Sequence, residues 1–356
     1  MKDNAYAKIE AKQAETKRLF YKGHTACAGC GMAIAIRHML GAAGPNTIVS
    51  GATSCSEIVS SQFPRTSWGV PYIHVAFETA ASVASGIDAG LKSLGKNVNI
   101  IALAGDGGTY DIGLQALSGM VDRKQNVLYV CYDNECYANT GIQRSGATPY
   151  GAWTTTSPNG KFSLGNITFK KQICEMMIAQ GASYVATASV AYPEDLKNKV
   201  RKALSLRGPK FILIHSPCPP AWKCDSSKSI EISKLAIDSG MFVVYEMEGN
   251  RFTINIKPRF IPVEQYLRSQ GRFKHLTDDD IARIQIRVNY DWKRLGRRYR
   301  KRFMTMGWFP NLPKVKLGKG KKQEKKPKED KNKIHLREKI GTRIHGIHLR
   351  KKKTRS

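Results

Sequence analysis

The chain has 356 residues, of which 41% are hydrophobic, enough for one large α/β domain with appendages or for two domains. No apolar run reaches the roughly 18 residues that a transmembrane helix needs, and the charged N-terminus lacks the apolar centre of a secretory signal, so we expect a cytoplasmic protein without membrane contact. The net charge is +30, and residues 314–356 carry +14 of it, from 18 Lys or Arg and 4 Asp or Glu.

The first part of the chain alternates between helical and loop-like patterns. Residues 1–22 form an N-terminal arm, in which apolar and charged positions interleave as in a helix over 1–20. A loop rich in Gly and Cys follows, and a helix is expected to continue to about Leu40. Residues 47–50 indicate a short buried strand, and residues 78–94 have the spacing of a helix built from small side chains.

The clearest unit in the sequence spans 97–134. An apolar run over 97–104 predicts a buried strand, the periodicity over 111–123 predicts a helix, and residues 126–132 predict a second buried strand. Crossovers of this kind place their two strands in parallel. The sequence therefore favours an α/β fold with a mostly parallel sheet.

Further along the chain, residues 210–214 predict another strand and residues 240–257 a hairpin. After Pro313 the chain is rich in Lys and poor in apolar residues, so we expect disorder there. We divide the chain into an arm, a core domain, a C-terminal extension that packs on the core or on a partner, and a basic tail. These parts are expected at 1–22, 23–225, 226–313 and 314–356.

Two polar side chains follow neighbouring predicted strands. Asp106 and Asn134 lie at the carboxyl ends of these strands, where open parallel sheets bind ligands. Their oxygens suit Mg2+, which takes octahedral oxygen ligands and shares them with substrate phosphates. Gly105 and Gly107 would allow backbone N–H groups close to a diphosphate. The alternative is a loop in a protein that binds no nucleotide or diphosphate, with Asp106 capping the helix.

The cysteines form a second constellation. In a cytoplasmic chain, eight cysteines favour metal ligands, redox groups or core residues over disulfides. Cys27 and Cys30 form a C-x2-C pair, Cys55 follows after 24 intervening residues, and Cys218 comes after a predicted strand. Four such thiolates can hold a [4Fe–4S] cluster or a zinc ion, and spacing does not separate the two. The cysteines with no pattern partner are expected to be ordinary core or surface residues: Cys131, Cys174 and Cys224.

The segments 105–113 and 132–145, continued by 147–158, resemble the β subunits of the pyruvate:ferredoxin oxidoreductase family, and the similarity runs from about Gly23 to Phe273. The resemblance implies a thiamine-diphosphate-binding fold with a central, mostly parallel sheet flanked by helices, plus a C-terminal extension. It implies Mg2+ ligation by Asp106, Asn134 and the backbone carbonyl of Cys136, and a [4Fe–4S] cluster on the four patterned cysteines. The residues it places at the cofactor are Gly105, Asp106, Gly107, Asn134, Cys136, Asn139, Thr140 and Gly141, with Asn139 beside the reacting atoms.

The implied activity is the oxidative decarboxylation of pyruvate with coenzyme A to acetyl-CoA and CO2, with electrons passing through the cluster to ferredoxin. A branched-chain or aryl 2-oxoacid is the alternative substrate. Thiamine activation needs a carboxylate, for which Glu78 is a weak candidate, so we expect an α subunit to supply it and much of the substrate site. Further subunits of the γ and δ types are implied, of which the δ-type would carry ferredoxin-like clusters, and this chain alone would be inactive. His24, beside the cysteine loop, is as well explained by structure as by cofactor contact.

The basic tail lies outside the resemblance. A solvated tail, docking of acidic ferredoxin, and salt-dependent nucleic-acid binding are its three interpretations. The tail has almost no aromatic residues to stack on bases, which makes nucleic acid the weaker partner. A nucleic-acid-binding protein on an inactive enzyme scaffold is therefore the rival function, and the Asp106/Asn134 pair and the four cysteines argue against it.

Overall fold

The computed structural model describes residues 18–299, 304 and 310–315. The chain divides into two compact units, Met1–Val315 and Lys316–Ser356. The second unit lies outside the described residues, as do residues 1–17 of the helix predicted over 1–20. The described residues 18–20 are not helical, so this end of the prediction is wrong. All helices and strands that the structure describes belong to the first unit.

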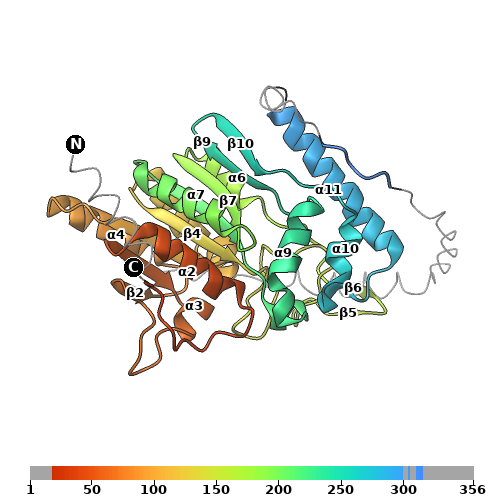
Figure 1. The fold of residues 1–356 in the computed structure, drawn as a ribbon, viewed down its shortest axis with the longest axis horizontal. Helices are drawn as coiled ribbons and strands as arrows, with labels where there is room; N and C mark the ends of the chain where they lie inside the picture. The colour runs from red at the N-terminus through yellow and green to blue at the C-terminus, as the bar shows by residue number, and fades with distance from the viewer. Residues whose placement is uncertain (1–17, 300–303, 305–309, 316–356) are drawn as a thin grey trace, which may run out of the picture. The chain divides into compact units, whose positions relative to one another are not determined.

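A single eight-stranded sheet forms the centre of this unit, in the order β10-β9-β7-β8-β4-β3-β1-β2 (Figure 1). The pairings from β7 to β2 are all parallel, whereas β9 and β10 form an antiparallel hairpin added at one edge. The strands are β1 (Thr47–Ala52), β2 (Tyr72–Val75), β3 (Asn99–Gly105), β4 (Leu128–Asp133), β7 (Tyr184–Ser189), β8 (Lys210–His215), β9 (Val244–Glu248) and β10 (Arg251–Ile256), and β5 (Asn159–Gly160) pairs with β6 (Ser163–Leu164) in a separate ribbon.

Several strands were easy to predict from the sequence because they are buried on both faces of the sheet. Every residue of β4, β7 and β8 is buried, and such strands read as continuous apolar runs. The predicted strands at 47–50, 97–104, 126–132 and 210–214 and the hairpin within 240–257 are confirmed, with small shifts of their ends. Strands β2 and β7 and the short ribbon of β5 and β6 were not predicted.

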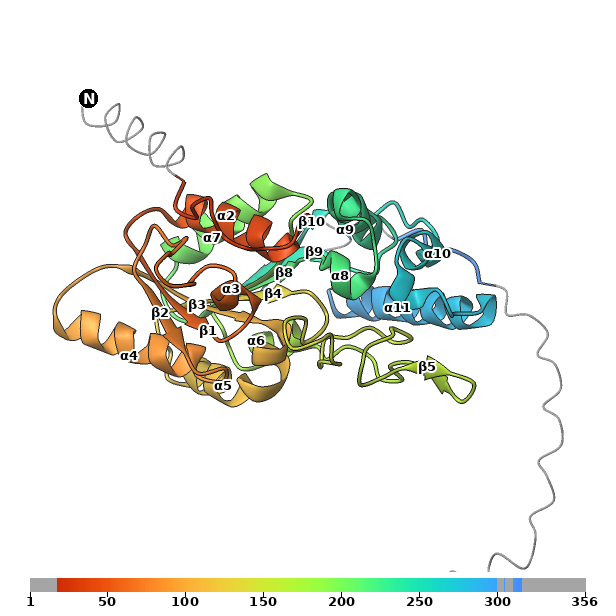
Figure 2. The ribbon, with the colours of Figure 1, turned by 90° about the horizontal axis from the view of Figure 1, so that it is seen from below.

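Helices cover both faces of the sheet (Figure 2). Helices α2 and α7 pack together on one face, and α4, α5 and α6 lie on the other. No described helix is both long enough and apolar enough to span a membrane. The helices are α2 (Gly31–Ala43), α3 (Cys55–Ile58), α4 (Ala80–Ser93), α5 (Leu114–Asp122), α6 (Ile173–Ala179), α7 (Pro193–Ser205), α8 (Pro219–Trp222), α9 (Ser229–Asp238), α10 (Val263–Arg268) and α11 (Asp278–Arg298), with short 3-10 turns at Ser226–Lys228 and Gly271–Phe273.

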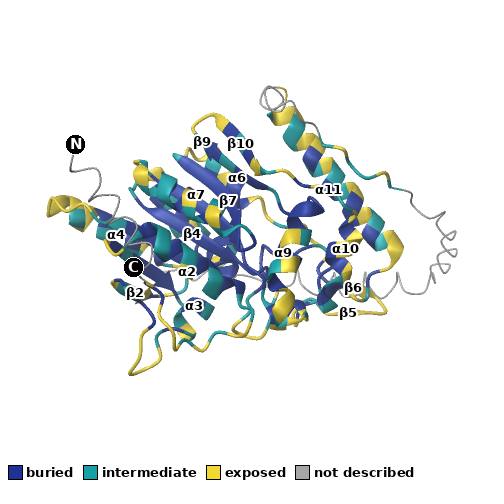
Figure 3. Ribbon diagram, viewed as in Figure 1, coloured by how far each residue is buried: buried dark blue, intermediate teal, exposed yellow. Residues whose placement is uncertain are grey.

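The segment after residue 225 shares its core with the sheet. Phe273 and Trp292 are almost fully buried and belong to the same hydrophobic cluster as Tyr129 and Phe211 of the central strands. Figure 3 shows the buried strands and a buried stripe along α11. The predicted boundary at 225/226 remains a prediction, but it crosses this continuous core.

The helix predicted over 111–123 is wrong in its first part. Residues Gly107–Ile112 form a π-helical turn, and the α-helix α5 begins only at Leu114. The wide turn brings the carbonyl oxygen of Gly108 against Gly113, where a Cβ atom would lie 2.1 Å from it. The Asp111 carboxylate accepts hydrogen bonds from the Gly146 amide at 2.8 Å and the Tyr137 hydroxyl at 3.0 Å, which hold the turn. Such turns often lie at functional sites.

Candidate active site at the carboxyl ends of the central strands

Four neighbouring parallel strands bring the predicted site residues to one edge of the sheet. Cys55 follows β1, Asp106 follows β3, Asn134 follows β4, and Cys218 follows β8. Because β1, β3, β4 and β8 are adjacent and parallel, their carboxyl ends meet at the same edge. Residues 163 positions apart in the sequence, Cys55 and Cys218, therefore approach one another.

Asp106 is buried at the centre of this edge, with 1% of its surface exposed. One carboxylate oxygen accepts a hydrogen bond from the Ser145 hydroxyl at 2.5 Å, and the other accepts one from the Asn134 amide N–H at 3.3 Å. Burial, followed by the neighbouring Asp133, raises the pKa of the Asp106 carboxyl well above its usual range. A cation beside the carboxylate would reverse this effect by stabilising the charged form.

Three oxygens converge at this point. The side-chain oxygen of Asn134 lies 2.9 Å from Asp106 Oδ1 and 2.8 Å from the Cys136 carbonyl oxygen. Turned over, the amide would donate from its nitrogen to both oxygens, whereas a cation bound among them would be faced by its oxygen. Adjacent ligands of an octahedral ion held at 2.0–2.1 Å lie about 2.9 Å apart. The residues present therefore fit Mg2+.

Glycines shape the loops that flank these oxygens. A Cβ atom at Gly107 would lie 2.3 Å from the Tyr137 ring, and Gly141 has a φ of 115°. Asn139, Thr140 and Gly141 are exposed in the loop after Cys136, and the Thr140 hydroxyl donates to Gln143 at 2.5 Å. This loop also reaches the cysteines, because the Asn139 side chain lies close enough to the Cys55 thiol to lower its pKa against the larger effect of burial.

The four patterned cysteines lie together. Burial is the main cause that raises the pKa of Cys55 to about 11 and of Cys218 to about 12, and the neighbouring thiols, Cys27 and Cys30 among them, add to it. The sulfur of Cys30 accepts backbone N–H groups from the first turn of α2, and that of Cys218 accepts one from α8. Donors at helix starts favour a sulfur that carries negative charge, as a cluster ligand does.

Among the described residues, no three His, Cys, Asp or Glu side chains are arranged to hold a single metal ion. A tetrahedral zinc site would need all four sulfurs about 2.3 Å from one centre. In a [4Fe–4S] cluster each thiolate binds a different iron, so the sulfurs are held further apart. The choice of the cluster over zinc stays a prediction. The oxygen set at Asp106 is a separate case, since it contains only one acidic side chain.

Several residues at the site were missed by sequence reasoning. Trp222 donates from Nε1 to the Asn134 carbonyl oxygen at 2.8 Å. Glu135 is buried between Lys170 and Arg272, at 3.3 and 2.6 Å. Lys170 also contacts Asp133. Burial alone would raise the pKa of the Glu135 carboxyl, but the positive charges of Lys170 and Arg272 outweigh it and lower this pKa to about 2. Nothing in the sequence around Lys170 or Arg272 marks them as partners of Glu135.

The two weaker candidates lie in the loops ahead of α2 and α4. His24 stacks on Phe20 with ring centroids 5.0 Å apart. Glu78 is exposed ahead of α4, and the preceding Phe77 packs edge-on against Tyr137, 5.9 Å between centroids. Contact of either residue with a cofactor stays a prediction. Cys131 and Cys174 are buried, as expected of core residues.

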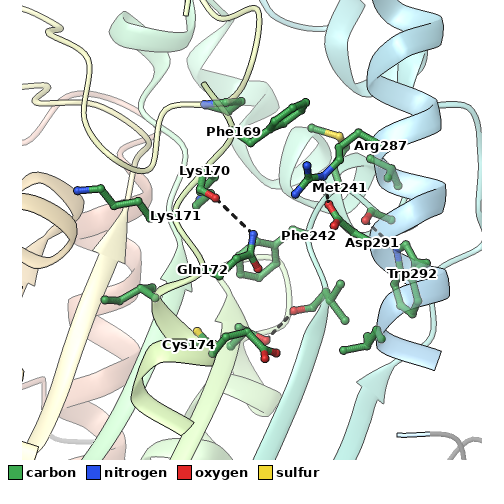
Figure 4. A pocket seen from close by; sticks show the side chains of 18 of the residues that line it. Phe169, Lys170, Lys171, Gln172, Cys174, Met241, Phe242, Arg287, Asp291 and Trp292 are labelled. Atoms are coloured by element: carbon green, nitrogen blue, oxygen red, sulfur yellow. Dashed lines mark hydrogen bonds and ion pairs between the residues drawn. The ribbon is translucent and has the colours of Figure 1, made fainter. Parts of the chain in front are cut away.

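A cavity of about 400 Å³ lies beside the site, between α11 and the sheet (Figure 4). Phe242 and Trp292 form part of its apolar wall, and Arg287 and Asp291 of α11 pair at 2.8 Å. Glu135 and Lys170 line its inner end, so the cavity adjoins the metal loop through those two charges. None of the predicted cofactor or cluster residues lines it.

Comparisons with known proteins find similar chains. Residues 52–214 match the family described as "Thiamine pyrophosphate enzyme, C-terminal TPP binding domain". Pyruvate synthase subunit PorB of Methanothermobacter thermautotrophicus is 51% identical over 265 residues, 74% of this chain and 92% of that protein. Ketoisovalerate oxidoreductase subunit VorB of Pyrococcus horikoshii is 46% identical, over 78% of this chain and 92% of that one. A solved 2-oxoglutarate:ferredoxin oxidoreductase from Magnetococcus marinus has a TM-score of 0.49 and 20% identity, over 63% of this chain and 80% of that one.

Proposed function

The chain belongs to the PorB family of pyruvate synthase subunits, and we propose that it binds thiamine diphosphate, Mg2+ and a [4Fe–4S] cluster in a pyruvate:ferredoxin oxidoreductase. It is a subunit of a 2-oxoacid:ferredoxin oxidoreductase with a thiamine-diphosphate domain. The reaction converts pyruvate and coenzyme A to acetyl-CoA and CO2, and ferredoxin takes the electrons. The observation that carries the proposal is the meeting of the Asp106 oxygens with the four cysteines at one sheet edge.

The oxygens of Asp106, Asn134 and Cys136 would hold the Mg2+ that binds the diphosphate. Thiamine diphosphate, when bound, supplies the electron sink for loss of CO2 from the 2-oxoacid. The chain's own contribution is to fix that group in place and to exclude water from the buried Asp106. Asn139 is proposed to lie beside the reacting atoms, and its closeness to the Cys55 thiol supports this placement.

The cysteines Cys27, Cys30, Cys55 and Cys218 are proposed as the cluster ligands. The loop from Cys136 to Gly141 lies between the metal site and these sulfurs, so electrons would have a short path from cofactor to cluster. Backbone N–H groups at the starts of α2 and α8 would stabilise the charge on two of the sulfurs.

Other chains complete the enzyme. We propose that an α subunit brings the thiamine-activating carboxylate and most of the substrate pocket, and that γ and δ-type subunits lead electrons to ferredoxin. Because substrate contacts would lie on the α subunit, a branched-chain 2-oxoacid is the second candidate substrate. The 46% identity to a ketoisovalerate oxidoreductase subunit supports keeping it.

The test is the iron, acid-labile sulfide and thiamine content of the complex purified anaerobically through this chain. Replacing Cys55 with Ser is expected to lower the iron and sulfide content by about four atoms each per chain, because one cluster loses a ligand. Cys224→Ser is the matched control, since Cys224 lies outside the set and should keep full iron content.

The same preparation distinguishes the substrates. Pyruvate with coenzyme A should reduce ferredoxin faster than 2-oxoisovalerate does. A faster reaction with 2-oxoisovalerate would shift the assignment to the branched-chain class. Zinc in place of iron, without thiamine, would remove the redox mechanism altogether and leave nucleic-acid binding by the basic tail to be tested.

A further inference from the structure

We propose that Arg272, contributed by the C-terminal segment, is a positioning residue for the metal-binding loop Asn134–Cys136. The inference rests on the proposed function, because it assumes that this loop binds Mg2+. Arg272 touches none of the three converging oxygens. It contacts Glu135 directly and Asn134 through Trp222, and these two residues set the positions of the loop oxygens.

The loop needs such support because its backbone is unfavourable. Glu135 has a φ of 66°, in the left-handed region that residues with a Cβ atom seldom occupy. Glu135 separates Asn134, whose side-chain oxygen lies 2.9 Å from Asp106 Oδ1, from Cys136, whose carbonyl oxygen lies 2.8 Å from that same Asn134 oxygen. Strained residues of this kind persist only where their surroundings fix them. Contacts to Glu135 therefore decide how well the oxygens stay aligned.

Arg272 fixes the Glu135 side chain. Arg272 Nη2 donates to Glu135 Oε2 at 2.6 Å, and both side chains are more than nine-tenths buried. Gln270 holds the other side of the guanidinium, accepting from Nε at 2.9 Å. The Thr148 hydroxyl donates to the Glu135 carbonyl oxygen at 2.7 Å, so the side chain and the backbone of Glu135 are held separately. Lys170 adds a second, longer contact at 3.3 Å.

Arg272 also supports Asn134, through Trp222. The guanidinium lies over the indole ring, 4.0 Å from its centroid, and the indole Nε1 donates to the Asn134 carbonyl oxygen at 2.8 Å. Stacking on an aromatic face is a contact that a planar guanidinium makes well and an ammonium makes less well. One side chain thus braces both Asn134 and Glu135, two successive residues of the loop.

The experiment measures metal affinity rather than activity. The anaerobic complex is stripped of metal and thiamine diphosphate, resupplied with thiamine diphosphate, and titrated with Mn2+, with free Mn2+ followed by electron paramagnetic resonance. Arg272→Gln is expected to raise the Kd for Mn2+ about 10- to 100-fold, the range found when outer partners of metal ligands are removed. Arg272→Lys should fall between this variant and the wild type.

The control is Lys199→Gln. Lys199 is 2% exposed and pairs with Asp195 at 2.8 Å on α7, so its removal breaks a buried ion pair away from the metal loop. It should lower the thermal midpoint and leave the Kd for Mn2+ unchanged. If Arg272→Gln behaves like Lys199→Gln, Arg272 is merely structural and the proposal is overturned.

Two milder variants cover the case in which Arg272→Gln does not fold. Trp222→Phe removes the indole donor but keeps a ring beneath the guanidinium, and Glu135→Gln keeps the side-chain shape; each should raise the Kd for Mn2+, by at least threefold. Unchanged affinities in both would overturn the proposal. Wild-type protein that binds no Mn2+ with thiamine diphosphate would instead contradict the proposed function.

Discussion

The imidazole of His215 is enclosed at the end of β8, packed between Trp222 and Phe242 with ring centroids 5.3 and 4.9 Å away. Neither ring nitrogen has a hydrogen-bond partner among the described residues. Burial lowers the pKa of His215 to about 4 from an ordinary 6.5. The positive charges of Lys170 and Arg272 lower it further, and the negative charge of Glu135 opposes both effects. His215 is therefore neutral in the folded protein and acts as an apolar ring.

This burial makes stability depend on pH. Between pH 6.5 and 4 the unfolded chain binds a proton at His215 that the folded chain does not, so stability is full above pH 6.5 and falls as the pH drops toward 4. The loss should reach about 1.4 kcal/mol at pH 5.5, or about 3 °C in thermal midpoint. His215→Leu should fold as well as wild type at pH 7.5, since no hydrogen bond is lost.

The measurement compares the thermal midpoints of the wild type and His215→Leu at pH 7.5 and 5.5. Other groups titrate equally in both proteins, so the difference between their losses reports on His215 alone. The wild-type protein should lose about 3 °C more than His215→Leu. Equal losses would mean that His215 is protonated in the folded state or is reached by water.

Some site residues could be predicted from sequence and others could not. Asp106 and Asn134 follow buried strands, so their residue type and their position at strand ends together indicated a metal site. Arg272 lies 137 positions from Glu135, and only the three-dimensional packing pairs them. A pattern within a short window cannot register such a contact, because both residues look like surface charges in the sequence.

The elements that carry the cysteines meet through glycines. The amide of Gly31 donates to the Pro217 carbonyl oxygen at 2.9 Å, which brings the start of α2 against the loop that bears Cys218. A Cβ atom at Gly31 would lie 2.6 Å from Pro217 N. At Gly29, where φ is 70°, it would lie 2.2 Å from the Ser226 carbonyl oxygen. The C-x2-C loop therefore packs closely against the segment 216–226 at two points, Gly29 and Gly31.

Gly31→Ala should push these two segments apart. We expect a loss of about 2 kcal/mol in stability from overpacking, and a lower iron content because Cys30 and Cys218 separate. Gly41→Ala in the same helix is the control, since nothing lies within 4 Å of its Cβ position. It should gain up to about 1 kcal/mol from helix propensity.

Thermal midpoints and iron assays on the two alanine variants decide the matter. Normal iron content in Gly31→Ala would show that the close approach of α2 to the 216–218 loop is not needed for the cluster.

Element type was predictable where burial produced a clear period. The strands β3, β4 and β8 read directly as apolar runs, and α2 and α4 as helices. The π-helical turn at Gly107–Ile112 was not predictable from periodicity, because its widened turn depends on hydrogen bonds from Gly146 and Tyr137 to Asp111. The departure from regular geometry falls directly after Asp106, at the site itself.

In the molecule as a whole, the C-terminal segment serves the site as well as the core. It was expected to pack over the core or a partner. It also supplies Arg272, which reaches the loop after β4. The sheet, the site loops and the segment after residue 225 thus share one hydrophobic core. Loss of that segment would remove the Arg272 contact from the proposed metal loop.

The basic tail can be separated from this unit by truncation after Val315. Removal takes away 17 Lys or Arg and 4 Asp or Glu and lowers the net charge from +30 to +17. The hydrophobic clusters are built from residues within 19–312, so the thermal midpoint and the iron content should not change. Elution from heparin should shift to lower salt, because fewer cations bind the polyanion.

Ferredoxin reduction then distinguishes the roles of the tail. If the tail steers acidic ferredoxin, truncation should slow the reaction at low ionic strength and leave it unchanged at high salt, where charges are screened. If the truncated and full-length proteins reduce ferredoxin at equal rates at both ionic strengths, and the truncated protein no longer binds RNA, the tail would be assigned to nucleic acid. A lower thermal midpoint on truncation would contradict the separation itself, and the tail would have to be counted as part of the folded unit.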